Sequence, residues 1–235
     1  MTVLAALAAI PGRADILPAV LESLRSQVDR LCVYLNGWDS VPECVRDLAD
    51  EHVLSAENEG AERKLWWAPE HEGIYLSCDD DFCYPPDYAA TMSAAVGRFG
   101  GQAIVTAHGR QYRERASTVH DVVPGSVGMY YRNVRERWVN YGGTGVMAWD
   151  AGKVRVPRYW QHRNMLDAQL SAWANRSQIP MWLIRHEGHW LETYRPLDPQ
   201  GIFRSSQREQ HRRRSAIIAE HGRTHGWRLY RAAEQ

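Results

Sequence analysis

Short apolar runs alternate along this chain with longer segments in which apolar residues recur every three or four positions. The runs at 3–10, 31–35 and 74–78 are typical of buried strands. A helix predicted over 16–27 has one apolar face, made by Leu17, Val20, Leu21 and Leu24. Strand, helix and strand of this length predict a βαβ unit, which requires a parallel sheet.

The same alternation continues to the end of the chain. Further strands are expected at 52–54, 103–107, 146–149 and 179–184, and further helices at 87–98, 164–174 and 205–220. The predicted fold class is therefore α/β, with a mostly parallel central sheet flanked by helices. We expect one domain over 1–235, divided into 1–107, 108–200 and a basic helical tail at 201–235 that lacks a continuous apolar face.

Composition places the chain among ordinary folded proteins, with 44% hydrophobic and 24% charged residues. No apolar run approaches the 18 residues that a membrane span requires. The first ten residues lack a basic start and run into Pro11 and Gly12, which predicts a strand and not a signal peptide. The four cysteines show no CxxC spacing and are interpreted as free thiols. We therefore expect a cytoplasmic location.

The net charge is zero, but the two halves of the chain differ. Residues 1–100 hold 7 Lys or Arg and 17 Asp or Glu, whereas residues 101–235 hold 21 and 11. An acidic half suits a cation and a basic half suits an anion. Arginines and aromatic residues interleave over 110–140, a pattern that fits either a groove for a phosphate-bearing polymer or a solvated loop. The Arg-rich run 212–214 is a second place where a polyanion could dock.

Three adjacent carboxylates follow the apolar run 74–78, namely Asp79, Asp80 and Asp81. Pro85 and Pro86 then suit the first turn of a helix, so the aspartates lie in a strand-to-helix crevice. Adjacent carboxylates stay ionised together only where a cation or solvent offsets their charge. Their oxygens are the ligands that Mg²⁺ or Mn²⁺ prefers beside a diphosphate. The alternative is that one aspartate only caps the next helix.

The segment from the strand through Asp-Asp-Asp to Tyr-Pro-Pro-Asp-Tyr at 84–88 resembles the DxD motif of GT-A glycosyltransferases, particularly glycosyltransferase family 2 and its small bacterial and phage relatives. This resemblance implies a GT-A fold and a nucleotide-sugar donor, most simply a UDP-sugar. It implies that Asp79 faces the nucleotide's ribose and that Asp81 binds the metal. It leaves open whether Asp79, Asp80 or both contact the nucleotide, and whether Asp79 also reaches the metal.

Two earlier loops resemble the nucleotide-binding segments of the same family. They are Ala-Ile-Pro-Gly-Arg at 9–13, with Pro11 and Arg13, and the stretch 33–39, where Asn36 or Asp39 would face the nucleobase. For these two residues a plain turn role is the alternative. Lys64, in a segment that resembles the family's helix over the donor, is the candidate contact to the diphosphate. Its alternative is a solvated helix lysine.

The second half resembles the acceptor side of such enzymes. Gly142 to Gly145 matches a glycine-containing segment that lies beside donor sugar and acceptor. Asp167 matches the acidic residue that acts as catalytic base at the start of the acceptor-side helix, although an aspartate there also interacts favourably with the helix macrodipole. By the same resemblance, His186 or His189 would complete the metal sphere.

The predicted function is therefore transfer of a sugar from a nucleotide-diphosphate sugar to an acceptor hydroxyl, with inversion at the anomeric carbon. No GxGxxG or GxxxxGK[ST] occurs, which removes support for a dehydrogenase or a P-loop enzyme. Phage relatives that glycosylate hydroxymethylated bases imply modified DNA as an acceptor and the host cytoplasm as the location. The alternatives are a cell-surface glycan precursor or small-molecule acceptor, a metal-dependent phosphatase or nuclease, and a non-catalytic sugar-nucleotide binder.

Overall fold

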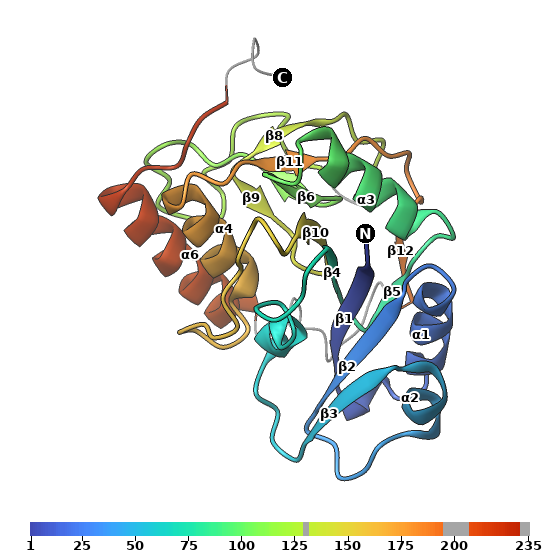
Figure 1. Cartoon of the computed structure of the whole chain (residues 1–235). Coiled ribbons are helices and arrows are strands. Elements are labelled where there is room, and N and C mark those ends of the chain that lie inside the picture. The colour runs from blue at the N-terminus through green and yellow to red at the C-terminus, as the bar shows by residue number, and fades with distance from the viewer. Residues whose placement is uncertain (129–131, 195–206, 231–235) are drawn as a thin grey trace.

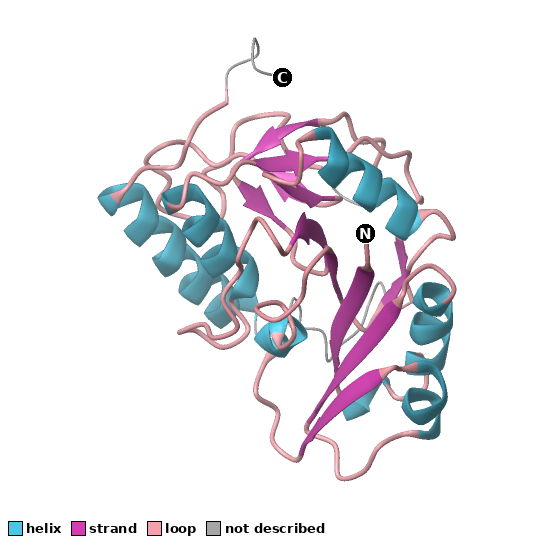
Figure 2. Ribbon diagram, viewed as in Figure 1, coloured by secondary structure: helices cyan, strands magenta, loops and turns pink. Residues whose placement is uncertain are grey.

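An eight-stranded sheet forms the centre of the computed structural model, which describes residues 1–128, 132–194 and 207–230 (Figure 1). In spatial order the strands are β3 (Glu51–Ser55), β2 (Arg30–Asn36), β1 (Val3–Ala9), β4 (Ile74–Cys78), β10 (Val146–Asp150), β6 (Ile104–Thr106), β11 (Met181–Leu183) and β8 (Arg137–Val139). Helices lie on both sides of this sheet (Figure 2). The predicted α/β class is confirmed.

The sheet is mostly parallel, as the sequence predicts. β3, β2, β1 and β4 pair in parallel, and β11 pairs in parallel with β6. β10 is antiparallel to both β4 and β6, and β8 is antiparallel to β11. The carboxyl ends of β1, β2, β4 and β6 therefore share one edge of the sheet with the amino end of β10. This edge is where ligands bind in open α/β sheets.

One face of the sheet is covered by α1 (Leu17–Arg25) and α3 (Tyr88–Arg98). Residues of alternating position, such as Ala5 and Leu7 on β1, point to this face, because side chains alternate along a strand. The four residues predicted as the apolar face of the first helix, Leu17, Val20, Leu21 and Leu24, are all fully buried here. A short helix, α2 (Glu43–Leu48), packs beside α1.

The opposite face is covered by the 3₁₀ turn η2 (Ala61–Leu65) and by α4 (Leu166–Arg176). Tyr75 on β4 and Trp149 on β10 stack there with ring centroids 4.8 Å apart. Both rings are fully buried. Burial on both faces explains why β1 and β4 read as continuous apolar runs in the sequence and not as alternating ones.

The C-terminal helix, α6 (Gln207–Thr224), corrects one expectation. It packs beside α4, where Ile218 of α6 and the following Trp227 join Ala168 and Ala172 of α4 in a small core (Figure 1). The basic tail therefore carries an apolar contact, which was missed because Trp227 lies beyond the helix. Residues 205 and 206 of the predicted helix lie outside the described residues.

Several short elements carry no signal in the sequence. They are η1 (Pro11–Arg13), α2, β8, the pair β5 (Phe82–Cys83) with β12 (Glu192–Thr193), and the pair β7 (Gly109–Arg110) with β9 (Tyr141–Gly142). Strands of two or three residues are too short to show a period, and their partners lie far away in the chain.

No helix in the described part of the chain is both long enough and apolar enough to cross a bilayer.

Candidate functional site

A pocket of about 510 Å³ opens at the carboxyl edge of the sheet. Its walls come from the ends of β1, β2 and β4, from the loop before β10, and from η2, α4 and α6. The aspartates that follow β4 and the predicted base on α4 line this same pocket. The parallel topology thus brings together segments that are separated by more than 80 residues.

Asp79 forms an ion pair with Lys64 of η2. The lysine side chain is 3% exposed, whereas that of Asp79 is 35% exposed and reaches the pocket. Burial alone would lower the pKa of Lys64, but the charge and hydrogen bond of Asp79, together with the charges of Asp167 and Asp80, outweigh burial and raise that pKa. Lys64 is therefore a buried, charged partner of the first aspartate and not a solvated lysine.

Asp80 faces the opposite wall, where it takes an ion pair from Arg13 and a hydrogen bond of 3.0 Å from the Ile10 backbone N–H. Its side chain is buried, and burial raises its pKa although Arg13 opposes the shift. Arg13 is held by η1, in which the Ala14 N–H donates to the Pro11 carbonyl. The second aspartate therefore ties the loop after β1 to the loop after β4.

Asp81 also contacts Arg13, with an Nη2 to Oδ2 distance of 2.9 Å. Burial raises the pKa of Asp81 to about 7, the neighbouring charge of Asp79 acts in the same direction, and Arg13 opposes both. One guanidinium thus serves two carboxylates. A further cation near Asp81 would therefore stabilise its ionised form.

Gly145 and Tyr84 hold Asp79 in place. The Asp79 N–H donates to the Tyr84 hydroxyl at 2.7 Å, and that hydroxyl donates to the Gly145 carbonyl at 2.8 Å. A Cβ on Gly145 would lie 1.9 Å from Oδ2 of Asp79, so no side chain fits there. Gly145 therefore brings the backbone close to the first aspartate.

Asp167 lies in the first turn of α4 and lines the pocket. Its Oδ1 accepts hydrogen bonds from the Thr144 N–H at 3.0 Å and from the Thr144 hydroxyl at 2.6 Å. The charge of Asp167 also raises the pKa of Lys64, by less than the charge of Asp79 does. Two hydrogen bonds from one residue orient the carboxylate and show that it does more than complement a helix dipole.

Asn36 and Asn164 position the segment that carries Lys64. Asn36, at the end of β2, donates to the Gly60 carbonyl at 2.9 Å and accepts from the Glu59 N–H at 2.6 Å. Asn164 accepts from the Ala61 N–H at 3.0 Å. Both asparagines also line the pocket. Asn36 is therefore a positioning residue whose amide is already engaged with the backbone.

Four residues predicted for the site are not brought into the pocket. Pro11 and Asp39 are exposed and do not line it, although Pro11 shapes the turn that carries Arg13. Both ring nitrogens of His186 lie within hydrogen-bonding distance of backbone carbonyls, those of Ala107 (2.9 Å) and Glu187 (3.0 Å). His189 is 74% exposed and pairs with Glu192 at 3.0 Å. The resemblance placed these histidines by their order in the chain, but neither of them lines the pocket that holds the aspartates.

The residues present fit a hard divalent cation only with help from a ligand. Asp79 and Asp81 both present partly exposed carboxylates to the pocket. Within the described residues, no three His, Cys, Asp or Glu side chains are grouped to hold a metal. Mg²⁺ is typically held by one or two carboxylates together with substrate phosphates and water. Two carboxylates beside a diphosphate would match that pattern.

Two further basic residues line this pocket, Arg110 on β7 and Arg214 on α6, together with Gln210. Tyr141 makes the largest contribution that raises the pKa of Arg214, and Asp167 raises it further. In the sequence, Arg110 belongs to the stretch 110–140 and Arg214 to the run 212–214, for each of which either a polyanion-binding or a solvated surface was expected. Their placement in the pocket depends on how β7 and α6 pack.

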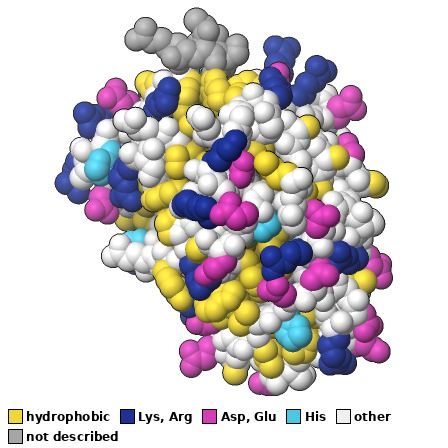
Figure 3. Space-filling view, viewed as in Figure 1, with side chains coloured by type: hydrophobic (Ala, Val, Ile, Leu, Met, Phe, Trp, Pro, Cys, Tyr) yellow, Lys and Arg dark blue, Asp and Glu magenta, His cyan; other side chains and the backbone are white. Residues whose placement is uncertain are grey.

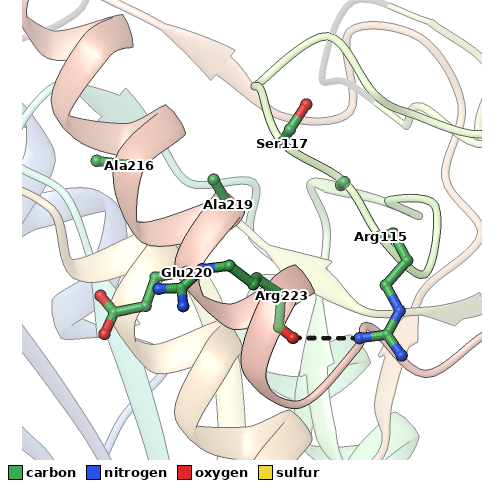
Figure 4. A pocket seen from close by; sticks show the side chains of 7 residues that line it. Arg115, Ser117, Ala216, Ala219, Glu220 and Arg223 are labelled. Carbon is green, nitrogen blue, oxygen red and sulfur yellow. Dashed lines mark hydrogen bonds between the residues drawn. The ribbon is translucent and has the colours of Figure 1, made fainter.

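A second hollow, of about 590 Å³, lies between α6 and residues 115–117 on another part of the surface (Figure 4). Its lining includes the small residues Ala216 and Ala219. Arg115 donates to the carbonyls of Gly222 and Arg223 at 3.1 and 3.3 Å, so its guanidinium holds the end of α6. This hollow is larger, but it contains none of the carboxylates described above.

Comparison with known proteins adds little to this geometry. No family model matches the sequence, and no curated protein matches it. The structure of A197 from STIV is one of 43 matching chains of solved structures, with a TM-score of 0.44 and 12% identity over 84% of this chain and 87% of that chain. This similarity is too low to carry an argument about family or activity. The function must be argued from the residues of the pocket.

Proposed function

We propose that this protein is a metal-dependent glycosyltransferase that moves a sugar from a nucleotide-diphosphate sugar to an acceptor hydroxyl. One observation carries the proposal: Asp79 and Asp81, at the carboxyl end of β4, share a pocket with Asp167. Carboxylates suited to a metal-bound diphosphate and a carboxylate suited to proton abstraction are what such a transfer requires. The GT-A resemblance of the Asp79–Tyr88 segment supports the same assignment, with a UDP-sugar as the proposed donor.

The donor would lie across the ends of β1, β2 and β4. Ala8, Ile10, Asn36 and Asn58 line that part of the pocket and leave room for a nucleoside. Asp79 and Asp81 would hold Mg²⁺ or Mn²⁺ against the diphosphate, and such an ion supplies charge neutralisation for the departing nucleoside diphosphate. Lys64 and Arg13 orient these carboxylates and keep the local charge balanced.

Asp167 would act as the general base. Its Oδ1 is oriented by Thr144, which holds the carboxylate toward the pocket. The carboxylate takes the proton of the acceptor hydroxyl as that oxygen attacks the anomeric carbon, and the bond from that carbon to the diphosphate oxygen breaks. Attack from the face opposite the leaving group inverts the anomeric centre and needs no covalent intermediate.

Two classes of acceptor follow from the sequence. A hydroxymethylated base in DNA would use the basic second half of the chain, whereas a glycan precursor or small molecule would enter the pocket alone. On the face drawn in Figure 3, positive and negative side chains are interleaved and do not form one basic patch. Retention on DNA at low salt, lost as salt rises, would support the DNA acceptor. Absence of DNA binding at low salt would exclude it.

The donor assignment is tested by thermal unfolding with Mg²⁺ or Mn²⁺ against a panel of nucleotides and nucleotide sugars. A ligand that binds the folded protein raises its melting temperature by mass action. We expect a metal-dependent rise with one nucleoside diphosphate, and loss of that rise in Asp81→Ala. Asp47→Ala, which removes an exposed aspartate from α2, is the matched control and should retain the rise. No rise with any nucleotide would contradict the proposal.

A further inference from the structure

The end of the pocket formed by Arg110, Arg214 and Gln210, hereafter the arginine end, is not used by the donor in the function proposed above. Arg110 lies on β7 and the other two lie on α6. The guanidinium of Arg110 lies over the Tyr141 ring, with its Cζ 5.6 Å from the ring centroid. Both guanidinium groups are thus built into the wall of the pocket.

Neither arginine has a carboxylate within 4 Å among the described residues, in contrast to Arg13 and Lys64. Two polar atoms of α6, Nε of Arg214 and Oε1 of Gln210, are also buried. Neither has a hydrogen-bond partner among the described residues. Buried polar atoms are almost always paired in folded proteins. A ligand that supplies the missing partners is the simplest reason for the chain to keep them.

The unpaired charges and polar atoms of the arginine end indicate which chemical groups its ligand must carry. Two guanidinium groups require an anion with several acceptor oxygens, and arginine matches phosphate better than any other cation. Oε1 of Gln210 requires a hydrogen-bond donor, which a hydroxyl group supplies. The ligand should therefore carry both a phosphate and a hydroxyl.

The position of this end assigns the ligand to the acceptor and not to the donor. α6, which carries Arg214, packs against α4, whose first turn holds Asp167, whereas the three consecutive aspartates follow β4. The diphosphate of the donor would lie beside Asp79 and Asp81, across the pocket. A phosphate held by Arg110 and Arg214 would instead belong to the molecule whose hydroxyl faces Asp167.

We infer that the acceptor is a phosphorylated, hydroxyl-bearing molecule, and that the arginine end binds its phosphate. This inference rests on the proposed function for the identity of the acceptor, but the phosphate subsite itself does not depend on it. A terminal phosphate monoester fits better than a polymer backbone, because part of Arg214 is buried inside the pocket and a phosphodiester would have to pass its chain on both sides.

The test is calorimetric titration of the full chain with inorganic phosphate, in the absence and presence of Mg²⁺ and the nucleoside diphosphate that raises its melting temperature. We expect phosphate to bind in both conditions. Arg214→Gln and Arg110→Gln should each raise the phosphate Kd at least about tenfold, because each removes one charged partner of the anion. Arg212→Gln is the matched control, since this arginine is 79% exposed on the same helix, and it should change the Kd by less than about twofold.

Four outcomes would overturn the inference: displacement of phosphate by the nucleoside diphosphate, equal displacement by acetate, displacement by a DNA duplex, or unchanged phosphate binding in both arginine variants. The first would assign the arginines to the donor, the second would remove the preference for phosphate, and the third would favour a polymer acceptor. Phosphate binding without any nucleotide binding would instead contradict the proposed function while leaving the subsite intact.

Discussion

The two ends of the pocket differ in how their charges are paired. The aspartate end is formed by Asp79, Asp80 and Asp81, and the arginine end by Arg110, Arg214 and Gln210. At the aspartate end, each of the three carboxylates has an ion-pair partner inside the chain, Lys64 for Asp79 and Arg13 for both Asp80 and Asp81. At the arginine end, Arg110 and Arg214 have no carboxylate within 4 Å among the described residues. The aspartate side chains can therefore be held in place by ion pairs before a ligand binds. The two arginines receive a negatively charged partner only when a ligand binds. Asp167 lines the same pocket.

The largest effect is expected for Asp167→Asn, which keeps the shape of the side chain and removes its basicity. Turnover, measured as release of nucleoside diphosphate from the donor, should fall about 10²- to 10⁴-fold, the usual contribution of a general base. Nucleotide binding should not change, because both ends of the pocket remain. Loss of nucleotide binding together with turnover would show that Asp167 belongs to the aspartate end.

Lys64→Met breaks the charge balance of the aspartate end. Removing one partner of a buried ion pair typically costs about 3–5 kcal/mol, and we expect about 2 kcal/mol here because the Asp79 side chain is 35% exposed. The chain has one other lysine, and Lys153→Met is the control: its side chain is 52% exposed, so its loss should cost less than about 1 kcal/mol. Denaturant unfolding measures the loss of stability in both variants. Equal losses would show that Lys64 does not stabilise the fold through its ion pair with Asp79.

Gly145→Ala should displace Asp79, because the new Cβ would lie 1.9 Å from its Oδ2. We expect a loss of stability of about 1–3 kcal/mol from the overpacking, and loss of metal-dependent nucleotide binding. Binding of inorganic phosphate at the arginine end should survive. Gly97→Ala in α3 is the control, since a Cβ added at Gly97 would meet no atom within 4 Å and alanine favours a helix, which should add about 0.5–1 kcal/mol.

An effect of similar size is a pH dependence that arises at His108, two residues before Arg110. Burial lowers the pKa of His108 from 6.5 to about 3, and the charges of His186 and Arg110 act in the same direction. Because the folded pKa lies below the unfolded one, this histidine stabilises the fold above pH 6.5 and that contribution is lost as the pH falls toward 3. Between about pH 7 and pH 5 the loss should be about 2 kcal/mol.

His108→Asn should remove that part of the pH dependence, measured by urea unfolding at the two pH values. His189→Asn, at an exposed histidine, is the control and should leave it in place. An unchanged pH dependence in His108→Asn would show that His108 is not held in its neutral form.

Local pattern was sufficient for most of the secondary structure because strand and helix periods are properties of neighbouring residues. The strands 3–10, 31–35 and 74–78 and the helix over 16–27 were located within one or two residues of β1, β2, β4 and α1. Parallel pairing then follows from the βαβ order, and with it the convergence of the loops at the carboxyl edge. Asp79, Asp80 and Asp81 were singled out because they follow a predicted strand, and Arg13 and Lys64 because of the GT-A resemblance; the structure brings all five into one pocket.

The sequence by itself therefore determined the α/β class, the edge at which a ligand would bind and the acidic cluster at that edge. Tertiary structure alone decided which charges meet. Lys64 and Asp79 are 15 residues apart, Arg13 and Asp80 are 67 apart, and nothing local indicates that they pair. Likewise, Arg214 lines the pocket with Asp167 whereas His186 and His189 do not, and this depends on how the elements that carry these residues pack. Which side chains form ion pairs across such separations depends on how helices and strands pack together. A pattern of neighbouring residues in the sequence does not indicate this packing.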